Sequence, residues 1–171
     1  MNLFFPSTIS KETVFTEITR ELSRQNLNII NSQFRPWGGF FVIDETDTEK
    51  FIDAYFSSLN KDELIIGNKL SPKILIVEAG KRLSWQYHYR RAEIWKVIGG
   101  EAGVIRSESD AENDLEKFRP GDIIELKQGE RHRLIGIEGS WGIIAEIWQH
   151  TDKNHPSNEE DIVRITDDFG R

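Results

Sequence analysis

Four residues whose side chains can bind a metal ion lie at strand-like spacing in the middle of the sequence. Gln86 and His88 are separated by one residue, so on a strand both side chains point to the same face. Glu93 follows after a four-residue turn, and His132 comes 39 residues later, directly after KQGER. Two neutral nitrogens and two oxygens suit zinc, iron, manganese, cobalt or nickel. We therefore expect one divalent metal ion, with zinc as the first choice.

Short apolar runs separated by turn residues dominate the sequence from Leu64 onward. Pairs such as Gly99-Gly100 and Pro120-Gly121 supply the turns. The runs are KILIVEAG, SWQYHY, EIWKVIGGEAGVI, PGDIIEL, HRLIGI, WGIIAEIW and DIVRI. About seven strands at this spacing predict a small all-β barrel or double sheet. Inside such a barrel the four ligand residues converge.

Two amphipathic helices are predicted ahead of most of these strands. In residues 10–28 apolar side chains recur every four to five residues, and Ser10 is the expected N-cap. In residues 48–59 five apolar side chains share one stripe, and Asp47 or Thr48 is the expected cap. We divide the chain into a helical arm, residues 1–34, and a barrel, residues 35–171.

Composition excludes several classes of function. The 22 Lys and Arg against 29 Asp and Glu give a net charge of −7, which argues against binding to nucleic acid. The chain has 0 Cys, which excludes disulfides, thiolate zinc fingers, iron–sulfur clusters and a cysteine nucleophile. The first residues lack the basic region of a signal peptide, and no stretch approaches the roughly 20 apolar residues of a membrane span. We expect a cytoplasmic protein with no nucleic-acid and no membrane partner.

The spacing of glycines around the ligands resembles the two motifs of the cupin family. The first motif runs from Gly80 through Gln86, His88 and Glu93 to Gly100, with Gln in place of the first His. The second runs from Gly121 to Gly136 and includes His132, with Lys and Gly where Pro and Asn are usual. The resemblance implies an all-β cupin, a double-stranded β-helix or jelly-roll barrel, with the helical arm as an N-terminal extension.

Four further landmarks are similar to the type II mannose-6-phosphate isomerase family within the cupins. They are RPWG at residues 35–38, RLSWQYHYRRAEIW at 82–95, GERHRL at 129–134 and DIVRITDDFGR at 161–171. The family's Gln-x-His-x-His reads Gln-Tyr-His-Tyr-Arg here, so one family histidine is replaced by Arg90. Relative to the family's shorter link, residues 44–70 are expected to form a helical insertion.

The resemblance implies aldose–ketose interconversion of a phosphosugar through an enediol, with a divalent metal polarising the substrate oxygens. A base must move a proton between C1 and C2, and Glu146 in the apolar run AEIW is the candidate. Arginines must hold the phosphate, and Arg91 and Arg164 are the first candidates. Arg91 is also a candidate catalytic residue. The remaining candidate substrate contacts are Arg82, Arg171 and Trp95.

Other readings of the same residues stay open. The pocket could hold a sugar or sugar phosphate without turnover, or serve another cupin enzyme such as a nucleotide-sugar epimerase or a dioxygenase. His150 and His155 lie in the polar stretch QHTDKNHPSNEE and are expected to be solvated. Exposed sheet edges and the apolar stripe of the arm predict a homodimer.

Overall fold

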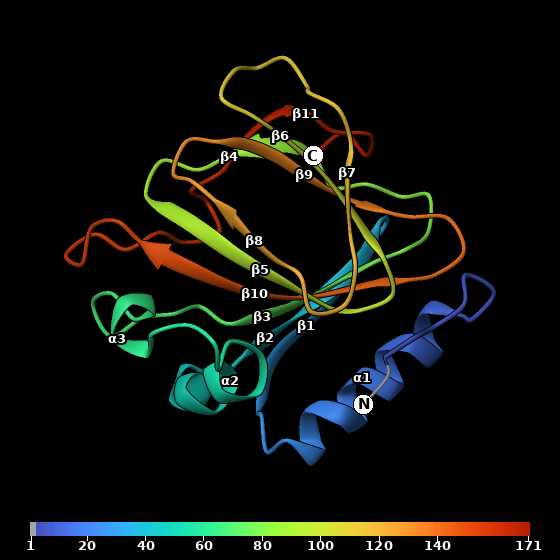
Figure 1. Ribbon diagram of the computed structural model, residues 1–171, viewed down its shortest axis with the longest axis horizontal. Coiled ribbons are helices and arrows are strands. Elements are labelled where there is room, and N and C mark those ends of the chain that lie inside the picture. Colours follow the sequence, from blue (N-terminus) through green and yellow to red (C-terminus); the bar gives the residue numbers. More distant parts are fainter. Residues whose placement is uncertain (1–2) are drawn as a thin grey trace.

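Two antiparallel sheets face each other in the structure, a computed structural model that describes residues 3–171 (Figure 1). The six-stranded sheet has the order β1 (Ile29–Arg35), β2 (Gly38–Ile43), β3 (Lys73–Val77), β10 (Gly142–His150), β5 (Arg91–Gly99) and β8 (Ile123–Leu126). The five-stranded sheet has the order β11 (Val163–Thr166), β4 (Trp85–Tyr87), β9 (Arg131–Gly136), β6 (Ala102–Ser107) and β7 (Glu116–Phe118).

The six-stranded sheet is buried on both faces. Ile74 and Ile143 on one face belong to an apolar cluster shared with the helices. Leu75 and Ile144 on the other face belong to a second cluster, which the five-stranded sheet completes. Side chains alternate along a strand, so each strand contributes to both clusters. This double burial explains why β3 and β10 are almost continuously apolar.

The same alternation carries polar side chains into the barrel. On β3, Lys73 points to the same face of the sheet as Leu75, two residues along the strand. On β10, Glu146 points to the same face as Ile144. Across the β5–β10 pair, Glu93 lies opposite Trp148 and Trp95 lies opposite Glu146. The site is therefore built from inward positions of strands whose outward positions anchor the sheet to the helices.

Helix α1 (Lys11–Arg24) packs on the outer face of the six-stranded sheet of its own barrel. As predicted, the Ser10 side chain caps it and accepts a hydrogen bond from the backbone N–H of Thr13 at 3.2 Å. The helix ends four residues earlier than predicted, because Asn26 turns the chain with a φ of 55°. The following residues form β1, so the arm of residues 1–34 contains most of a strand as well as the helix.

The region between β2 and β3 is helical, with η1 (Glu45–Asp47), α2 (Thr48–Tyr55) and α3 (Lys61–Leu64). Phe51 and Ile52 of α2 are fully buried in the cluster that also holds α1. Asp47 occupies the N-cap position of α2, but its carboxylate accepts hydrogen bonds from the backbone and side-chain amides of Asn28 instead. That contact ties α2 to the turn that follows α1.

Three strands were not predicted, and one predicted run is two strands. β1 is an edge strand with polar residues on both faces, and β7 has three residues, so neither shows a clear alternation. β2 opens with two glycines, and a Cβ at Gly38 would lie 1.9 Å from the carbonyl oxygen of Ile76. EIWKVIGGEAGVI divides into β5 and β6 at Gly100, whose φ is 61°.

The edge strand β1 exposes two large apolar side chains, Ile30 at 61% and Phe34 at 54%. An exposed sheet edge is one of the features from which we predict a homodimer, and the homodimer stays a prediction. Within residues 3–171, no helix combines the length and the apolar character needed to cross a bilayer.

Helix α1 is expected to contribute strongly to stability. Ile18 is 2% exposed in the cluster under the six-stranded sheet, so Ile18→Ala should lower the free energy of unfolding by about 2–5 kcal/mol. Urea denaturation measures this loss. Arg20→Ala, on the exposed side of the same helix, is the control and should change stability by about 0.5 kcal/mol or less. Equal losses in the two variants would show that α1 does not depend on this packing.

Candidate functional site

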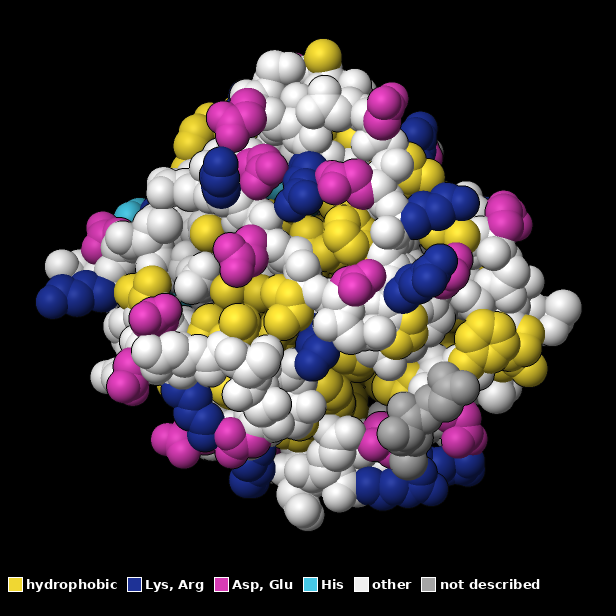
Figure 2. Space-filling model, viewed as in Figure 1, with side chains coloured by type: hydrophobic (Ala, Val, Ile, Leu, Met, Phe, Trp, Pro, Cys, Tyr) yellow, Lys and Arg dark blue, Asp and Glu magenta, His cyan; other side chains and the backbone are white. Residues whose placement is uncertain are grey.

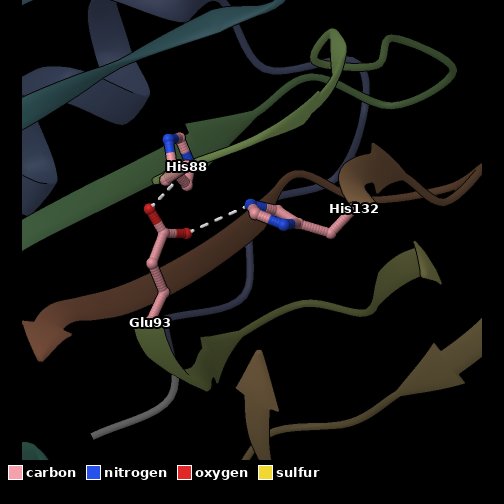
Figure 3. A group of neighbouring side chains, drawn as sticks. All are labelled: His88, Glu93 and His132. Carbon is pink, nitrogen blue, oxygen red and sulfur yellow. Dashed lines mark ion pairs between the residues drawn. The ribbon is translucent and has the colours of Figure 1, made fainter. Parts of the chain in front are cut away.

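His88, Glu93 and His132 form a buried cluster inside the barrel (Figure 3). Glu93 lies on β5 and His132 on β9, while His88 directly follows β4. The Nε2 atom of His88 lies 3.1 Å from Glu93 Oε1, and the Nε2 atom of His132 lies 3.3 Å from Glu93 Oε2. Each residue is at most 2% exposed, so water cannot solvate these polar atoms.

The two histidines are held with their Nε2 atoms turned toward Glu93. Nδ1 of His88 donates to the backbone carbonyl of Asp161 at 2.7 Å, and Nδ1 of His132 donates to the carbonyl of Glu130 at 2.9 Å. A carbonyl only accepts, so each Nδ1 carries the proton and a neutral ring keeps its Nε2 lone pair for the centre. This arrangement is typical of metal-binding histidines.

The cluster fits a divalent metal ion. Two ligands bound to one zinc ion at about 2.0–2.2 Å lie roughly 3–3.5 Å apart, which matches the separations of 3.1 and 3.3 Å. Among the described residues, neither Glu93 Oε2 nor His132 Nε2 has a hydrogen-bond partner, although both atoms are buried. Burial opposes ionisation of Glu93, but His88 and Arg91 outweigh it and hold the pKa of this carboxyl well below its usual range.

Gln86, the fourth predicted ligand, lies beside the cluster. It pairs with His132 across β4 and β9 and lines the neighbouring cavity. Its amide oxygen accepts a hydrogen bond from the Ser84 hydroxyl at 2.5 Å. The structure therefore brings three of the four predicted ligands together, with Gln86 in the lining of the adjacent cavity, and the assignment of Gln86 as a ligand stays a prediction.

A cavity of about 110 Å³ opens beside Glu93. Trp95, Arg91, Arg164 and Arg171 line it as predicted candidates, while Arg82 lies outside its lining and pairs with Asp168 at 2.6 Å. Sequence reasoning did not select two further cations of its wall, Arg35 and Lys73. On the face that Figure 2 shows, basic and acidic side chains are interspersed. The cavity lining combines five basic residues with Glu93, Glu146 and Glu159.

Glu146 lies in the cavity wall and is 5% exposed. The indole N–H of Trp95 donates to one carboxyl oxygen at 2.8 Å, and that of Trp148 donates to the other at 2.9 Å. Burial, followed by the negative charge of Glu93, raises the pKa of Glu146 to about 7. The side chain is therefore fixed in place and close to half-protonated at neutral pH.

A family model described as "Mannose-6-phosphate isomerase C-terminal" matches residues 55–167, about two thirds of the chain. The chain belongs to this family. Among curated relatives, the Xanthan biosynthesis protein XanB of Xanthomonas campestris pv. campestris is 29% identical over 141 residues, which cover 81% of this chain. A mannose-1-phosphate guanylyltransferase of Escherichia coli is 26% identical over 138 residues, again 81% of this chain. The matches span 23% of each relative's length.

Solved structures show that the chain has the cupin fold. An oxalate decarboxylase of Lactobacillus farciminis, in a formate complex, aligns with a TM-score of 0.53 at 15% identity, covering 83% of this chain and 34% of that one. The capsular polysaccharide assembling protein CapF of Staphylococcus aureus gives 0.53 at 11% identity, covering 78% and 33%. The predicted all-β cupin with an N-terminal helix is confirmed.

In this family member, Arg91 is part of the framework around the cluster. Its Nε donates to Glu93 Oε1 at 2.8 Å, and its Nη1 donates to the Ser157 hydroxyl at 2.9 Å and the Asn158 carbonyl at 3.1 Å. The guanidinium lies 3.6 Å from the ring centre of Trp148 and is buried. Most of its donors are engaged, so it holds Glu93 in place and offers little to a ligand.

Asp161, which was not predicted, connects the C-terminal segment to His88. Its carboxylate accepts hydrogen bonds from the backbone N–H groups of Tyr89 and Arg90, each at 3.0 Å, and from the Ser157 hydroxyl at 2.6 Å. Its carbonyl accepts the Nδ1 proton of His88. One residue thereby fixes both the backbone after His88 and the orientation of its ring.

The prediction that His150 is solvated is wrong. His150 is the last residue of β10 and is 0% exposed, and burial is the main reason why its pKa falls to about 4. Its Nδ1 accepts from the backbone N–H of Ser157 at 3.0 Å, and its Nε2 lies 3.2 Å from the Ser71 hydroxyl. The polar sequence around it had suggested a loop, but these two partners satisfy the buried ring. His155 is exposed, as expected.

Asp161→Ala should weaken metal binding about 10- to 100-fold, because the lost carboxylate no longer fixes the backbone after His88 or the position of the Asp161 carbonyl that accepts from its Nδ1. Competition with a chelator of known affinity measures the dissociation constant. Asp152→Ala is the control, since Asp152 is exposed and accepts only from the backbone N–H of Asn154. Unchanged metal affinity in folded Asp161→Ala would contradict this role.

Glu146 makes stability depend on pH in the metal-free protein. Its pKa rises on folding from 4.5 to about 7, so the folded state keeps a proton that the unfolded state releases. The resulting stabilisation is complete below about pH 4.5 and disappears as the pH rises through 7, a loss of roughly 3 kcal/mol. Glu146→Gln should remove this loss, and urea unfolding at pH 5 and pH 8 measures it. Identical pH dependence in Glu146→Gln and wild type would show that Glu146 does not cause the loss. Glu125→Gln, at an exposed position, is the control and should keep the pH dependence of the wild type.

Proposed function

We propose that this cupin is a metal-dependent aldose–ketose isomerase of a phosphosugar, with mannose 6-phosphate as the first substrate to test. One observation supports the proposal most directly. A carboxyl group with a pKa near 7, Glu146, lies in the same cavity wall as the ligand Glu93 and several cations. Isomerisation through an enediol needs a proton acceptor that becomes a proton donor, next to groups that stabilise negative charge.

Glu146 is suited to the proton transfer. The pKa of about 7 applies to the metal-free protein, and a cation at Glu93 would lower it by cancelling the repulsion between the two carboxylates. Glu146 would then be ionised and able to take the proton from C2 of an aldose and return it to C1. The indole N–H groups of Trp95 and Trp148 hold both oxygens, so the carboxyl does not rotate between the two steps. Glu146 and Glu93 are diagonal neighbours on β10 and β5, roughly 7–8 Å apart between Cα atoms, and both line the cavity.

His88, Glu93 and His132 are the proposed ligands of one divalent metal ion, with Gln86 as a fourth, and zinc is the proposed ion. Bound there, the ion would polarise the hydroxyl and carbonyl oxygens of the sugar. Arg91 keeps Glu93 in position through its Nε hydrogen bond. We therefore assign Arg91 a positioning role and not a direct contact with the phosphate.

Arg164 is the proposed centre of phosphate binding. Among residues 3–171 it has no hydrogen-bond or ion-pair partner, and it lies in the cavity lining with Arg35 and Arg171. Burial, and then the charges of Arg171 and Arg35, lower the pKa of Arg164. A phosphate dianion would relieve this mutual repulsion and accept several charge-assisted hydrogen bonds. The substrate class also agrees with the name of the relative from Escherichia coli, a mannose-1-phosphate guanylyltransferase.

Glu146→Gln should lower the isomerisation rate about 10²- to 10⁴-fold, because glutamine cannot accept the proton. Metal content and the affinity for mannose 6-phosphate should stay close to wild type, while His132→Ala should lose the metal. A coupled assay for the ketose, with metal analysis and calorimetry on the same samples, separates these effects. Glu125→Gln is the matched control on an exposed barrel position.

The non-catalytic alternative has its own outcome in the same experiment. A binding domain would be stabilised by phosphosugars, but would form no isomer with zinc, iron, manganese, cobalt or nickel. That result across a panel of aldose phosphates of different chain length would refute the isomerase.

A further inference from the structure

Lys73 is a buried cation of the cavity that the chemistry above does not use. Its side chain is 6% exposed, and its Nζ lies 4.2 Å from the ring centre of Trp148 and 5.1 Å from that of Phe40. Among residues 3–171, its one hydrogen-bonding partner is the carboxylate of Glu159. Because a buried ammonium group needs a compensating negative charge, this partner matters to the whole cavity.

Glu159 differs from the other carboxylates in the cavity wall. Glu93 and Glu146 are buried and fixed by neighbouring side chains, whereas the Glu159 side chain is 66% exposed. It lies on the irregular segment between β10 and β11 and also lines a second hollow that contains Lys69. A carboxylate this exposed is solvated as soon as it moves away, but buried Lys73 then needs another anion in its place. The Glu159 carboxylate can therefore leave Lys73 when a second negative charge replaces it.

The basic residues of the cavity fall into two groups, those engaged by a neighbouring side chain and those still available to a ligand. Arg91 is bound to buried Glu93, Arg171 is paired with Asp167 at 2.8 Å, and Arg35 bonds the side chain of Gln33. Lys73 and Arg164 remain, one held only by an exposed carboxylate and the other without a recorded partner within residues 3–171.

The Glu159 carboxylate contacts Lys73 and shares the cavity lining with Arg164. Glu159 pairs with Lys73 and lies close enough to Arg164 to oppose the lowering of the pKa of that guanidinium by burial and by Arg171. An anionic group of a ligand at the position of the Glu159 carboxylate would therefore contact Lys73 and be attracted by Arg164. A dianion at this place would gain more from the two cations than a single carboxylate does.

We propose that Lys73 binds the anionic group of the ligand and that Glu159 is the internal occupant which this group displaces. The identification of that group as the phosphate of a sugar rests on the proposed function. When the ligand enters, Lys73 exchanges a protein carboxylate for the phosphate, and Glu159 moves into solvent. The affinity of the cavity for phosphosugars is then set partly by competition from the protein's own side chain.

Calorimetric titration of the metal-loaded protein with mannose 6-phosphate and with inorganic phosphate tests this exchange. Glu159→Gln should bind both probes about three- to fivefold more tightly, because the competing charge is gone. Lys73→Met should bind them at least tenfold more weakly, since a charge-assisted contact is lost. Glu160→Gln is the matched control, because it removes an equal charge from the exposed neighbouring residue. Unphosphorylated mannose should not distinguish the variants.

The double variant Lys73→Met with Glu159→Gln decides between displacement and a general change of charge. Once Lys73 is absent, removal of Glu159 should no longer tighten binding. Equal affinities in Glu159→Gln and Glu160→Gln would overturn the proposal, as would weaker phosphate binding in Glu159→Gln. If Lys73→Met does not fold, the comparison of these two glutamine variants remains decisive. Inorganic phosphate binds without turnover in every variant, so a failed isomerase assay and a failed displacement are distinguishable.

Discussion

The burial of one carboxylate, Glu93, is the constraint on which the site depends. An ionised carboxylate at 2% exposure costs several kcal/mol unless nearby groups compensate it. Arg91 compensates one oxygen through its Nε hydrogen bond, but the other faces the Nε2 atom of His132 and has no hydrogen-bond partner among the described residues. Burial opposes protonation of His132, but the neighbouring Glu93 carboxylate outweighs it and raises the pKa of this ring, so a proton can balance the second oxygen in the metal-free protein. A metal ion bound at the two Nε2 atoms would take over this role.

The orientation of His88 depends on the irregular segment between β10 and β11. His88 depends on the carbonyl of Asp161, and the Asp161 carboxylate depends on the Ser157 hydroxyl and two backbone N–H groups. Ser157 in turn donates its backbone N–H to buried His150 at the end of β10. The connection between β10 and β11 therefore fixes a proposed metal ligand from one side. The same connection carries Glu159 to the cavity, so orientation of the cluster and occupancy of the cavity are linked through a few residues.

The sequence predicted the features that follow from local spacing. Alternation within short apolar runs predicted the barrel, and the one-residue spacing of Gln86 and His88 on the strand before Glu93 predicted the cluster. Features that depend on contacts between distant residues were missed. Lys73 opens the apolar run KILIV, and nothing local shows that it turns inward against Trp148. Arg82 lies in a family motif, yet its position beside Asp168 directs it away from the cavity lining.

Two carboxylates on neighbouring strands acquire opposite properties from their surroundings. Glu93 lies beside Arg91 and two imidazoles, which keep its pKa low despite burial, so it remains an ionised ligand. Glu146 is also buried but receives only neutral indole N–H groups, and the charge of Glu93 raises its pKa further, to about 7. Such a division suits one group for holding a cation and the other for exchanging protons. It also couples them. A cation held by Glu93 would cancel the repulsion felt by Glu146 and lower its pKa, so the proposed base becomes ionised at neutral pH when the cluster is filled.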